Sequence, residues 1–354
     1  MRALVAMSGG VDSSMAAALM LDAGYDVIGV TLKQWEGPGG EMPTAGCCTV
    51  GDAEDARRVA AQLDVPYYVL DYVDEFRKNV VDRFGAEYMA GRTPNPCIEC
   101  NRTVRFHALL ERTEQLGCDI LVTGHHARVR REGDRFRLLK AVDGTKDQSY
   151  VLHMLEQTEL SRIQLPVGEM TKDEVRRRAA TMGLRTADKP DSQDLCFVGH
   201  GDYRQFIRTQ FPDAAVPGPI IDTAGNEVGA HSGTVDFTIG QRKGLGVSFG
   251  EPRFVVDIEP ATATVVIGRK HDLEVAGCRV GQVSFIDRAP PVDPYVDVKV
   301  RYRSKPVAAH LFEDAAGWRV EFADRQRSVA PGQAAVFYDG DYVVGGGIIE
   351  SVVR

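Results

Sequence analysis

The sequence contains no long apolar run and no pattern typical of a secretory signal. None of its hydrophobic stretches approaches the roughly 18 to 20 residues that a membrane-spanning helix needs. The N-terminus passes from Met1 and Arg2 directly into the apolar stretch RALVA, without the charged region, apolar core and cleavage site of a signal peptide. We therefore expect a cytoplasmic protein that makes no contact with a membrane.

Positive charge is in the minority, with 42 Lys and Arg against 50 Asp and Glu. The formal net charge of −8 argues against a wholly basic nucleic-acid binder, although local basic stripes remain compatible with RNA. The seven cysteines are an odd number in a long chain without an export signal. A disulfide framework is therefore not expected, and metal binding or thiol chemistry becomes the question.

The chain has 354 residues, more than a single hydrophobic core usually contains, and its sequence pattern changes once along the chain. Over residues 1–205, short apolar runs alternate with helical patterns, which predicts an α/β domain with a parallel sheet. From residue 206, alternation rich in Gly, Pro and Val predicts a small β-rich domain at 206–272 and a C-terminal β-barrel at 273–354. We expect strands at 2–7, 26–32, 66–71 and 119–124, a polar hairpin at 127–142, and helices at 13–23, 51–63, 74–90, 102–116 and 171–183.

Residues 6–14, AMSGGVDSS, lie between the first expected strand and the first expected helix. They do not form a Walker A loop, because its lysine is missing. A strand-to-helix turn with two glycines lets backbone N–H groups crowd around an anion at the helix N-terminus. Asp12 is a candidate ligand for Mg²⁺. On these residues alone, a turn that only reverses the chain stays the alternative.

The ends of two other expected strands supply further candidates, because open α/β sheets bind ligands beyond the carboxyl ends of their strands. Leu32, in GVTLKQW, is expected to cover the adenine of a nucleotide, and Gly124, in VTGHHAR, to let the backbone approach the adenosine. His125 in the same segment is either a substrate contact or an ordinary histidine at a strand end.

Three cysteines stand in segments that favour thiol chemistry. Cys97 and Cys100 lie in RTPNPCIECN, expected as a rigid double-proline turn just before a helix, and Cys196 lies in KPDSQDLCFVGHG, expected as a polar loop. Thiols at helix N-termini are generally more acidic and more nucleophilic than exposed thiols elsewhere. Two distant loop thiols near an anion-binding turn suggest that one carries a persulfide and the other releases its terminal sulfur. A turn with idle thiols is the structural alternative.

Eight short segments occur in the order found in a known family: SGGVDSS, CC at 47–48, TPNPCIECN, GHHAR, KDQSYVL, DSQDLCF, TIGQRKGLG and PGQ. The first resembles the loop of the PP-loop ATP pyrophosphatases, which split ATP into AMP and pyrophosphate while they adenylate a substrate. The whole series resembles the bacterial tRNA-specific 2-thiouridylases over essentially the full length. That family converts the wobble uridine of Lys, Glu and Gln tRNAs to 2-thiouridine.

The resemblance implies roles for individual residues. Cys196 receives a persulfide from a sulfur-relay protein or a cysteine desulfurase, and Cys100 is the nucleophile that completes sulfur release and leaves a Cys100–Cys196 disulfide. The implied ATP contacts are Ala6, Met7, Ser8, Gly9, Gly10, Val11, Asp12, Ser13, Leu32 and Gly124. The implied contacts to the target base are Asn95, Pro96 and Cys97, and those to the rest of the tRNA are His125, Lys146, Asp147, Gln148, Arg301, Tyr302 and Gln333.

One residue departs from the family pattern. Many members have Asp, the proposed acid or base, where this chain has Cys97, so that role is either absent or moved. The replacement creates a C-x-x-C pair with Cys196 as a third thiol. Three thiolates with one open position suit a [4Fe–4S] cluster, and zinc would also accept them. The persulfide and cluster mechanisms both stay open, as do the roles of Cys47 and Cys48.

Two other classes of function fit parts of the sequence. A ligase or amidating synthetase for a small metabolite explains the glycine turn but leaves Cys100 and Cys196 without a role. A non-catalytic RNA-binding module leaves the intact turn and the thiols unexplained. Basic residues are spread over several clusters that would together form a discontinuous phosphate track, at 102–105, 128–131, 176–178, 242–243 and 301–305.

Overall fold

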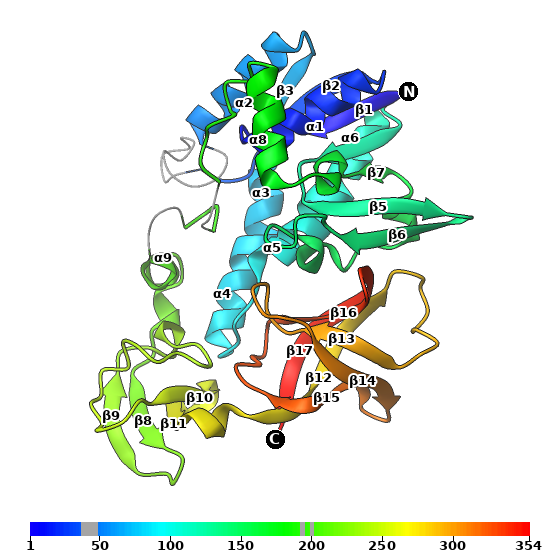
Figure 1. Cartoon of the computed structure of the whole chain (residues 1–354). Helices are drawn as coiled ribbons and strands as arrows, with labels where there is room; N and C mark the ends of the chain where they lie inside the picture. The colour runs from blue at the N-terminus through cyan, green and yellow to red at the C-terminus, as the bar shows by residue number, and fades with distance from the viewer. Residues whose placement is uncertain (37–48, 192–194, 199–201) are drawn as a thin grey trace.

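A five-stranded parallel sheet forms the framework of the N-terminal part of the chain. The structure is a computed structural model, and it describes residues 1–36, 49–191, 195–198 and 202–354 (Figure 1). Cys47 and Cys48 lie outside the described residues. The strand order is β3-β2-β1-β4-β7, and every neighbouring pair is parallel. The strands are β1 Arg2–Ala6, β2 Asp26–Lys33, β3 Tyr67–Asp71, β4 Ile120–Thr123 and β7 Ile163–Gln164.

This sheet separates two apolar cores. Successive side chains of a strand point to opposite faces, so Ala3 and Val5 of β1 join one core and Leu4 joins the other. Helices α1 (Val11–Asp22), α2 (Val50–Gln62) and α8 (Lys172–Thr181) contribute to the first core. The second core lies against two longer helical segments and extends to the barrel. Burial on both faces is what a central parallel strand requires.

The two longer helical segments each contain a π-helical stretch. The first runs through α3 (Val73–Phe76), Arg77–Val81 and α4 (Asp82–Met89). The second runs through α5 (Pro96–Glu99), Cys100–Ala108 and α6 (Leu109–Gln115). It begins earlier than the expected 102–116, so Cys97 and Cys100 lie in its first turns rather than in a turn before it. Pro96 stands at the first helical position, and the Asn95 side chain accepts a hydrogen bond from the Cys97 N–H at 3.1 Å, which explains the earlier start.

The middle of the chain forms a small β-rich unit. Helix α9 (Tyr203–Gln210) leads into a four-stranded sheet of order β10-β11-β8-β9 (Figure 1). Its strands are β8 Gly218–Asp222, β9 Glu227–His231, β10 Phe254–Glu259 and β11 Thr264–Gly268. The TIGQRKGLG segment lies between β9 and β10, and Ile239 and Leu245 within it pack into the core of this unit.

Six antiparallel strands close into a barrel at the C-terminal end. Their order is β12-β15-β14-β13-β16-β17, and pairing of β17 with β12 closes the ring. The strands are β12 Val275–Phe285, β13 Tyr295–Lys299, β14 Val307–Asp314, β15 Gly317–Gln326, β16 Ala334–Asp339 and β17 Tyr342–Val353. The predicted sequence of a parallel-sheet domain, a small β-rich domain and a β-barrel is confirmed.

The predicted polar hairpin is also present, as β5 (Ala127–Glu132) and β6 (Arg135–Lys140). It leaves the parallel sheet and lies beside the barrel, where Leu139 pairs with Tyr342 of β17. The remaining short helices in the N-terminal part include α7 (Gln157–Leu160) and the 3₁₀ turns at 149–152 and 166–169. Among the described residues, no helix is both long enough and apolar enough to cross a membrane.

Candidate active site

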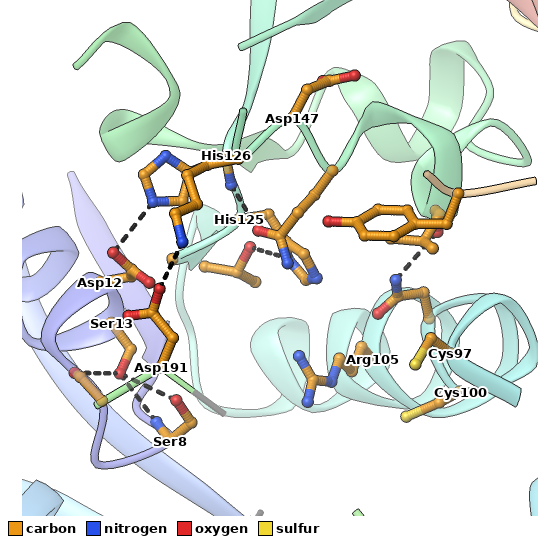
Figure 2. Close-up of a pocket in the computed structure, with 18 of the residues that line it drawn as sticks. Ser8, Asp12, Ser13, Cys97, Cys100, Arg105, His125, His126, Asp147 and Asp191 are labelled. Atoms are coloured by element: carbon orange, nitrogen blue, oxygen red, sulfur yellow. Dashed lines mark hydrogen bonds and ion pairs between the residues drawn. The ribbon is translucent and has the colours of Figure 1, made fainter. Parts of the chain in front are cut away.

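A cavity of about 1570 Å³ opens at the carboxyl ends of β1, β2 and β4. The glycine turn lines one end of it, the three thiols of Cys97, Cys100 and Cys196 line another part, and a barrel loop at residues 302–306 completes the wall. Figure 2 shows the turn and the cysteine helix facing each other across this space. Most predicted site residues therefore share one cavity. The three that do not line it are Gly9, Arg301 and Gln333.

The glycine turn leaves the start of α1 open to an anion. Gly10 is the N-cap of α1 and offers no side chain to the first N–H groups of the helix. The turn is stabilised from within, because Ser13 Oγ accepts a hydrogen bond from the Ser8 N–H at 3.0 Å. Gly9 has a φ of +73°, and a Cβ there would lie 2.2 Å from the Asp52 carbonyl oxygen. A larger residue would therefore displace the turn.

Gly124 stands at a position where only a residue without a side chain fits. A Cβ at Gly124 would lie 2.6 Å from the Ser13 nitrogen, so the end of β4 touches the start of α1 only because this residue is glycine. Leu32 lines the same part of the cavity from the end of β2 and is 7% exposed. Both residues lie at the edge of the sheet, and their contacts to a nucleotide stay a prediction.

Asp12 is held by the Lys172 ammonium group and by the His126 ring instead of standing open for a metal ion. Its carboxylate oxygens lie 2.6 and 2.8 Å from Lys172 Nζ, and one of them lies 3.0 Å from His126 Nε2. Burial favours a higher pKa for Asp12, but the hydrogen bonds and charges of His126 and Lys172 lower it overall. With both oxygens engaged, this arrangement does not fit Mg²⁺ at Asp12, and we assign no reaction step to such an ion.

A second carboxylate extends this ionic network. Asp191 lies 2.9 Å from Lys172 Nζ and 2.8 Å from Lys146 Nζ. Burial would raise the pKa of Asp191, but the two lysines lower it below its ordinary range. Lys189 pairs with Asp52 and Asp55 at 2.7 Å on the other side of the turn. Three lysines thus line the cavity close to the glycine turn, and each is paired with one or two carboxylates there.

Sequence reasoning missed Lys172, Lys189, His126 and Asp191. Lys172 follows Thr171, the N-cap of α8, and nothing in the TKDEV pattern indicates that its side chain turns inward to Asp12. The sequence analysis singles out His125 and not the adjacent His126. His125 hydrogen-bonds through Nδ1 to Thr123 Oγ1 at 2.7 Å, and burial together with the charge of Arg105 lowers its pKa to about 3. His125 is therefore a neutral group of the cavity wall at physiological pH.

The three thiols differ in exposure. Cys97 is exposed, Cys100 is 7% exposed and Cys196 is half-buried. The Cys100 sulfur accepts a hydrogen bond from Gln34 Nε2 at 3.3 Å, which fixes it against the end of β2. Among the residues that the structure describes, no three His, Cys, Asp or Glu side chains come together as a set that could hold a metal ion. A cluster or zinc at Cys97, Cys100 and Cys196 stays a hypothesis.

Residues 195–198 form a turn, as the expected loop requires, but Cys196 is anchored there by apolar packing, so the expected polar character is wrong for these residues. The neighbouring Phe197 is 5% exposed, and its ring lies 5.2 Å from that of Phe84 and 5.1 Å from that of Phe206. Leu195 and Val198 pack against the same core. The aromatic residue directly after the cysteine is thus what brings its backbone to the cavity, a signal that the sequence DLCFV does contain.

The barrel closes the cavity with Tyr302 and Lys299. Lys299 Nζ lies 5.7 Å from the ring centre of Tyr150 and 5.9 Å from that of Tyr302, and burial lowers the pKa of this lysine. Asp147 and Gln148 lie at the same wall with Lys146. Tyr302 is 37% exposed, so its ring is accessible at the cavity rim.

Two predicted tRNA contacts serve as ties between parts of the molecule. Arg301 Nη2 donates to the Ile239 carbonyl at 2.9 Å, which joins the barrel to the middle unit, and burial lowers the pKa of Arg301. Gln333 Nε2 donates to the Thr93 carbonyl at 2.7 Å, which joins the barrel to the segment before Asn95. Contacts of either residue to RNA stay a prediction.

Three family models cover almost the whole chain. They are described as a tRNA methyl transferase HUP domain at residues 1–200, a tRNA methyl transferase PRC-barrel domain at 204–269 and an aminomethyltransferase beta-barrel domain at 275–349. A solved 4-thiouridine synthetase in complex with RNA and ATP is 19% identical with a TM-score of 0.39, covering 60% of this chain and 50% of that one, which is too distant to support an argument.

Curated relatives match over the full length. The tRNA-specific 2-thiouridylase MnmA of Chloroflexus aurantiacus is 49% identical over 349 residues, covering 98% of this chain and 97% of that protein. The protein of the same name from Moorella thermoacetica is 48% identical over 360 residues, covering 99% and 100%. With this identity over the full length and all three units in the same order, the chain belongs to the MnmA family of tRNA-specific 2-thiouridylases.

Proposed function

We propose that this chain catalyses the ATP-dependent 2-thiolation of the wobble uridine in tRNAs of the Lys, Glu and Gln type, in the cytoplasm. The observation that carries the proposal is that one cavity contains both the glycine turn with its three lysines and the thiols of Cys100 and Cys196. A nucleotide-activating end and a sulfur end within one space are what an adenylation followed by sulfur transfer requires.

The first step is activation of the base by ATP. The C2 oxygen of uracil is a poor leaving group, so its attack on the α-phosphate converts it to an adenylate and releases pyrophosphate. The N–H groups at the start of α1 and the side chains of Lys146, Lys172 and Lys189, which line the same cavity, are proposed to contact the phosphates and the charge that develops on them. The ATP contacts proposed are the turn from Ala6 to Ser13, Leu32 and Gly124.

The second step moves sulfur. In the proposed route, a sulfur-relay protein or cysteine desulfurase leaves a persulfide on Cys196, whose terminal sulfur attacks C2 and expels AMP. The Cys100 thiolate then attacks the Cys196 sulfur, so that the electron pair of the broken S–S bond stays on the thiocarbonyl sulfur. A Cys100–Cys196 disulfide results. We favour this route over a cluster because the described side chains do not gather as a metal-binding set.

The tRNA has to deliver its target base into this cavity, which means that the base leaves its stack. Asn95, Pro96 and Cys97 lie at the cavity wall beside Cys100 and are proposed to contact the base. The exposed ring of Tyr302 and the segment from Lys146 to Gln148 are proposed to contact the anticodon loop, with His125, Arg301 and Gln333 as further tRNA contacts. The domain limits proposed are 1–205, 206–272 and 273–354.

Pyrophosphate release from ATP, measured with and without unmodified Glu tRNA, tests the proposal. We expect release to depend on the tRNA and 2-thiouridine to form when a persulfide donor is present. A ligase for a small metabolite would instead release pyrophosphate at a rate that tRNA does not change and that a small acid or amine increases. Retained RNA affinity without any turnover would identify a binding module.

A further inference from the structure

Cys97 and Cys100 stand one helical turn apart at the start of the helical segment 96–115. Cys100 has helical backbone angles, with φ −59° and ψ −46°. One turn of α-helix separates the Cα atoms of residues three apart by about 5 Å, which lies inside the range that a disulfide bridges. Figure 2 shows both side chains leaving the helix on the same side. The pair is therefore placed to form a disulfide with little movement.

The two thiols differ in how they meet solvent. Cys97 is exposed, whereas Cys100 is 7% exposed and is held by Gln34 at the floor of the cavity. A disulfide between Cys100 and Cys196 would lie inside the cavity, where the substrate RNA also has to enter. An external dithiol reaches a disulfide sulfur only where that sulfur is accessible. Of these three cysteines, Cys97 offers the most accessible sulfur.

We propose that Cys97 is a resolving thiol that transfers the disulfide from the Cys100–Cys196 pair to the Cys97–Cys100 pair. The inference rests on the proposed function, because that function creates the first disulfide. The inference gives a role to Cys97, which lines the cavity but belongs to no group of described side chains that could hold a metal ion.

The exchange needs no added oxidant. The Cys97 thiolate attacks the Cys100 sulfur, the Cys100–Cys196 bond breaks, and its electron pair goes to Cys196, which leaves as a thiolate. One disulfide is consumed and one is formed, so the protein's oxidation state is unchanged. A dithiol reductant of the thioredoxin class then attacks the exposed Cys97 sulfur and supplies two electrons and two protons. Cys196 is meanwhile ready to accept the next persulfide.

Peptide mapping of the full-length protein after one turnover tests the proposal. Cys196 is first loaded by a cysteine desulfurase with cysteine, the donor is removed, and unmodified Glu tRNA and ATP are added without reductant. The products are alkylated and cut with trypsin.

Cys97 and Cys100 fall in one peptide, 93–102, and Cys196 falls in another, 186–204, because the Lys189–Pro190 bond resists cleavage. We expect peptide 93–102 to be lighter by two hydrogens and peptide 186–204 to be alkylated. A cross-link between the two peptides in the unaltered protein would overturn the proposal.

The Cys97→Ser variant supplies the converse result. We expect it to accumulate the cross-link between peptides 93–102 and 186–204. Its later turnovers should slow by about 10-fold or more relative to its own first turnover, because reduction then has to reach a shielded disulfide. Comparing turnovers within one variant separates lost resolution from any lost contact with the base, since the latter slows the first turnover as well. Raising the dithiothreitol concentration should restore the later turnovers. Cys278→Ala, a buried barrel cysteine, is the matched control.

The outcomes separate this inference from the proposed function. If the unaltered protein makes no 2-thiouridine with any persulfide donor, the proposed function fails and the resolving role falls with it. If it makes 2-thiouridine and ends as the Cys100–Cys196 cross-link, only the resolving role fails. Iron and sulfide that are retained after anaerobic purification and lost in Cys97→Ser would also overturn the resolving role, because Cys97 would then be a ligand.

Discussion

The two ends of the cavity are held together by different forces. At the phosphate end, Asp12, Asp191, Lys146 and Lys172 form pairs at 2.6 to 2.9 Å, so each side chain is fixed by an opposite charge. At the sulfur end, the cysteines come from two segments, the helical segment 96–115 and residues 195–198, which are positioned by packing and by the Gln34 hydrogen bond. The side chains of the first end are thus fixed by ion pairs, whereas the second end leaves its reactive groups able to change partners, as sulfur transfer demands.

Replacing Cys196 by Ser should separate the two ends most clearly. We expect 2-thiouridine formation to fall by about 1,000-fold or more, because the persulfide carrier is lost. ATP binding should stay close to normal, since the ionic network around Asp12 does not include Cys196. Nucleoside analysis of the tRNA and equilibrium binding of ATP measure the two effects. An equal loss of both would show that the ends are not independent.

Lys172→Met should break the phosphate end in the opposite way. Pyrophosphate release is expected to fall by about 100-fold or more, because a preorganised cation facing the phosphates is removed. Loading of Cys196 with persulfide should be retained. Arg178→Ala serves as the control on the same helix, where Arg178 pairs with Glu174 at the surface. If Lys172→Met lost persulfide loading as well, the variant would have lost its fold and not only its phosphate end.

Acid should affect two buried histidines and the carboxylates of the phosphate end over different pH ranges. Burial lowers the pKa of His125 to about 3 and that of His153 to about 4, from an ordinary value of 6.5. Their contribution to stability is complete above pH 6.5 and is lost as the pH falls towards those values, because the unfolded chain binds the protons first. The pKa values of Asp12 and Asp191 are lowered, so the stability that their pairs provide is lost only as the pH falls below their ordinary value of 3.8.

Urea unfolding at pH 7 and pH 5 measures how much stability is lost when these histidines become protonated in the unfolded chain. We expect each of the two histidines to account for a loss of about 1 to 2 kcal/mol in the free energy of unfolding over this interval. His153→Gln should remove its share of the loss, since an amide does not titrate. An unchanged pH dependence in that variant would contradict the assignment of His153 as a buried neutral group.

The smallest effect is expected at the tie between the barrel and the sulfur end. Gln333→Ala removes the hydrogen bond to the Thr93 carbonyl and should lower the free energy of unfolding by about 1 kcal/mol. Gln326→Ala, which removes a bond to the nearby Asp324 carbonyl in the same strand, is the control for losing an amide. A loss no greater than that of the control would show that the tie contributes nothing to stability.

The sequence predicts what local patterns determine and misses what the tertiary fold decides. Alternating strands and helices and the glycine turn could be read directly from the sequence pattern, whereas the three thiols were singled out by the resemblance to the family. The inward course of Lys172 could not be read in this way, because a lysine in the first turn of a helix normally faces solvent, and here two half-buried carboxylates, Asp12 and Asp191, reverse that preference. The choice between His125 and His126 likewise depends on the direction of the chain after β4. The sequence pattern predicts that the cysteine helix starts at residue 102, whereas capping by Asn95 starts it at Pro96.

The PGQ segment of the barrel fastens the chain just before the cysteine helix. The Thr93 N–H donates to the Pro331 carbonyl at 2.8 Å, the Thr93 carbonyl accepts from Gln333, and a Cβ at Gly332 would lie 2.8 Å from the Thr93 nitrogen. The barrel therefore grips one residue through its backbone on both sides. Thr93 stands three positions before Pro96. A rotation of the barrel would therefore also displace the start of the cysteine helix, so that the barrel and the helix turn together.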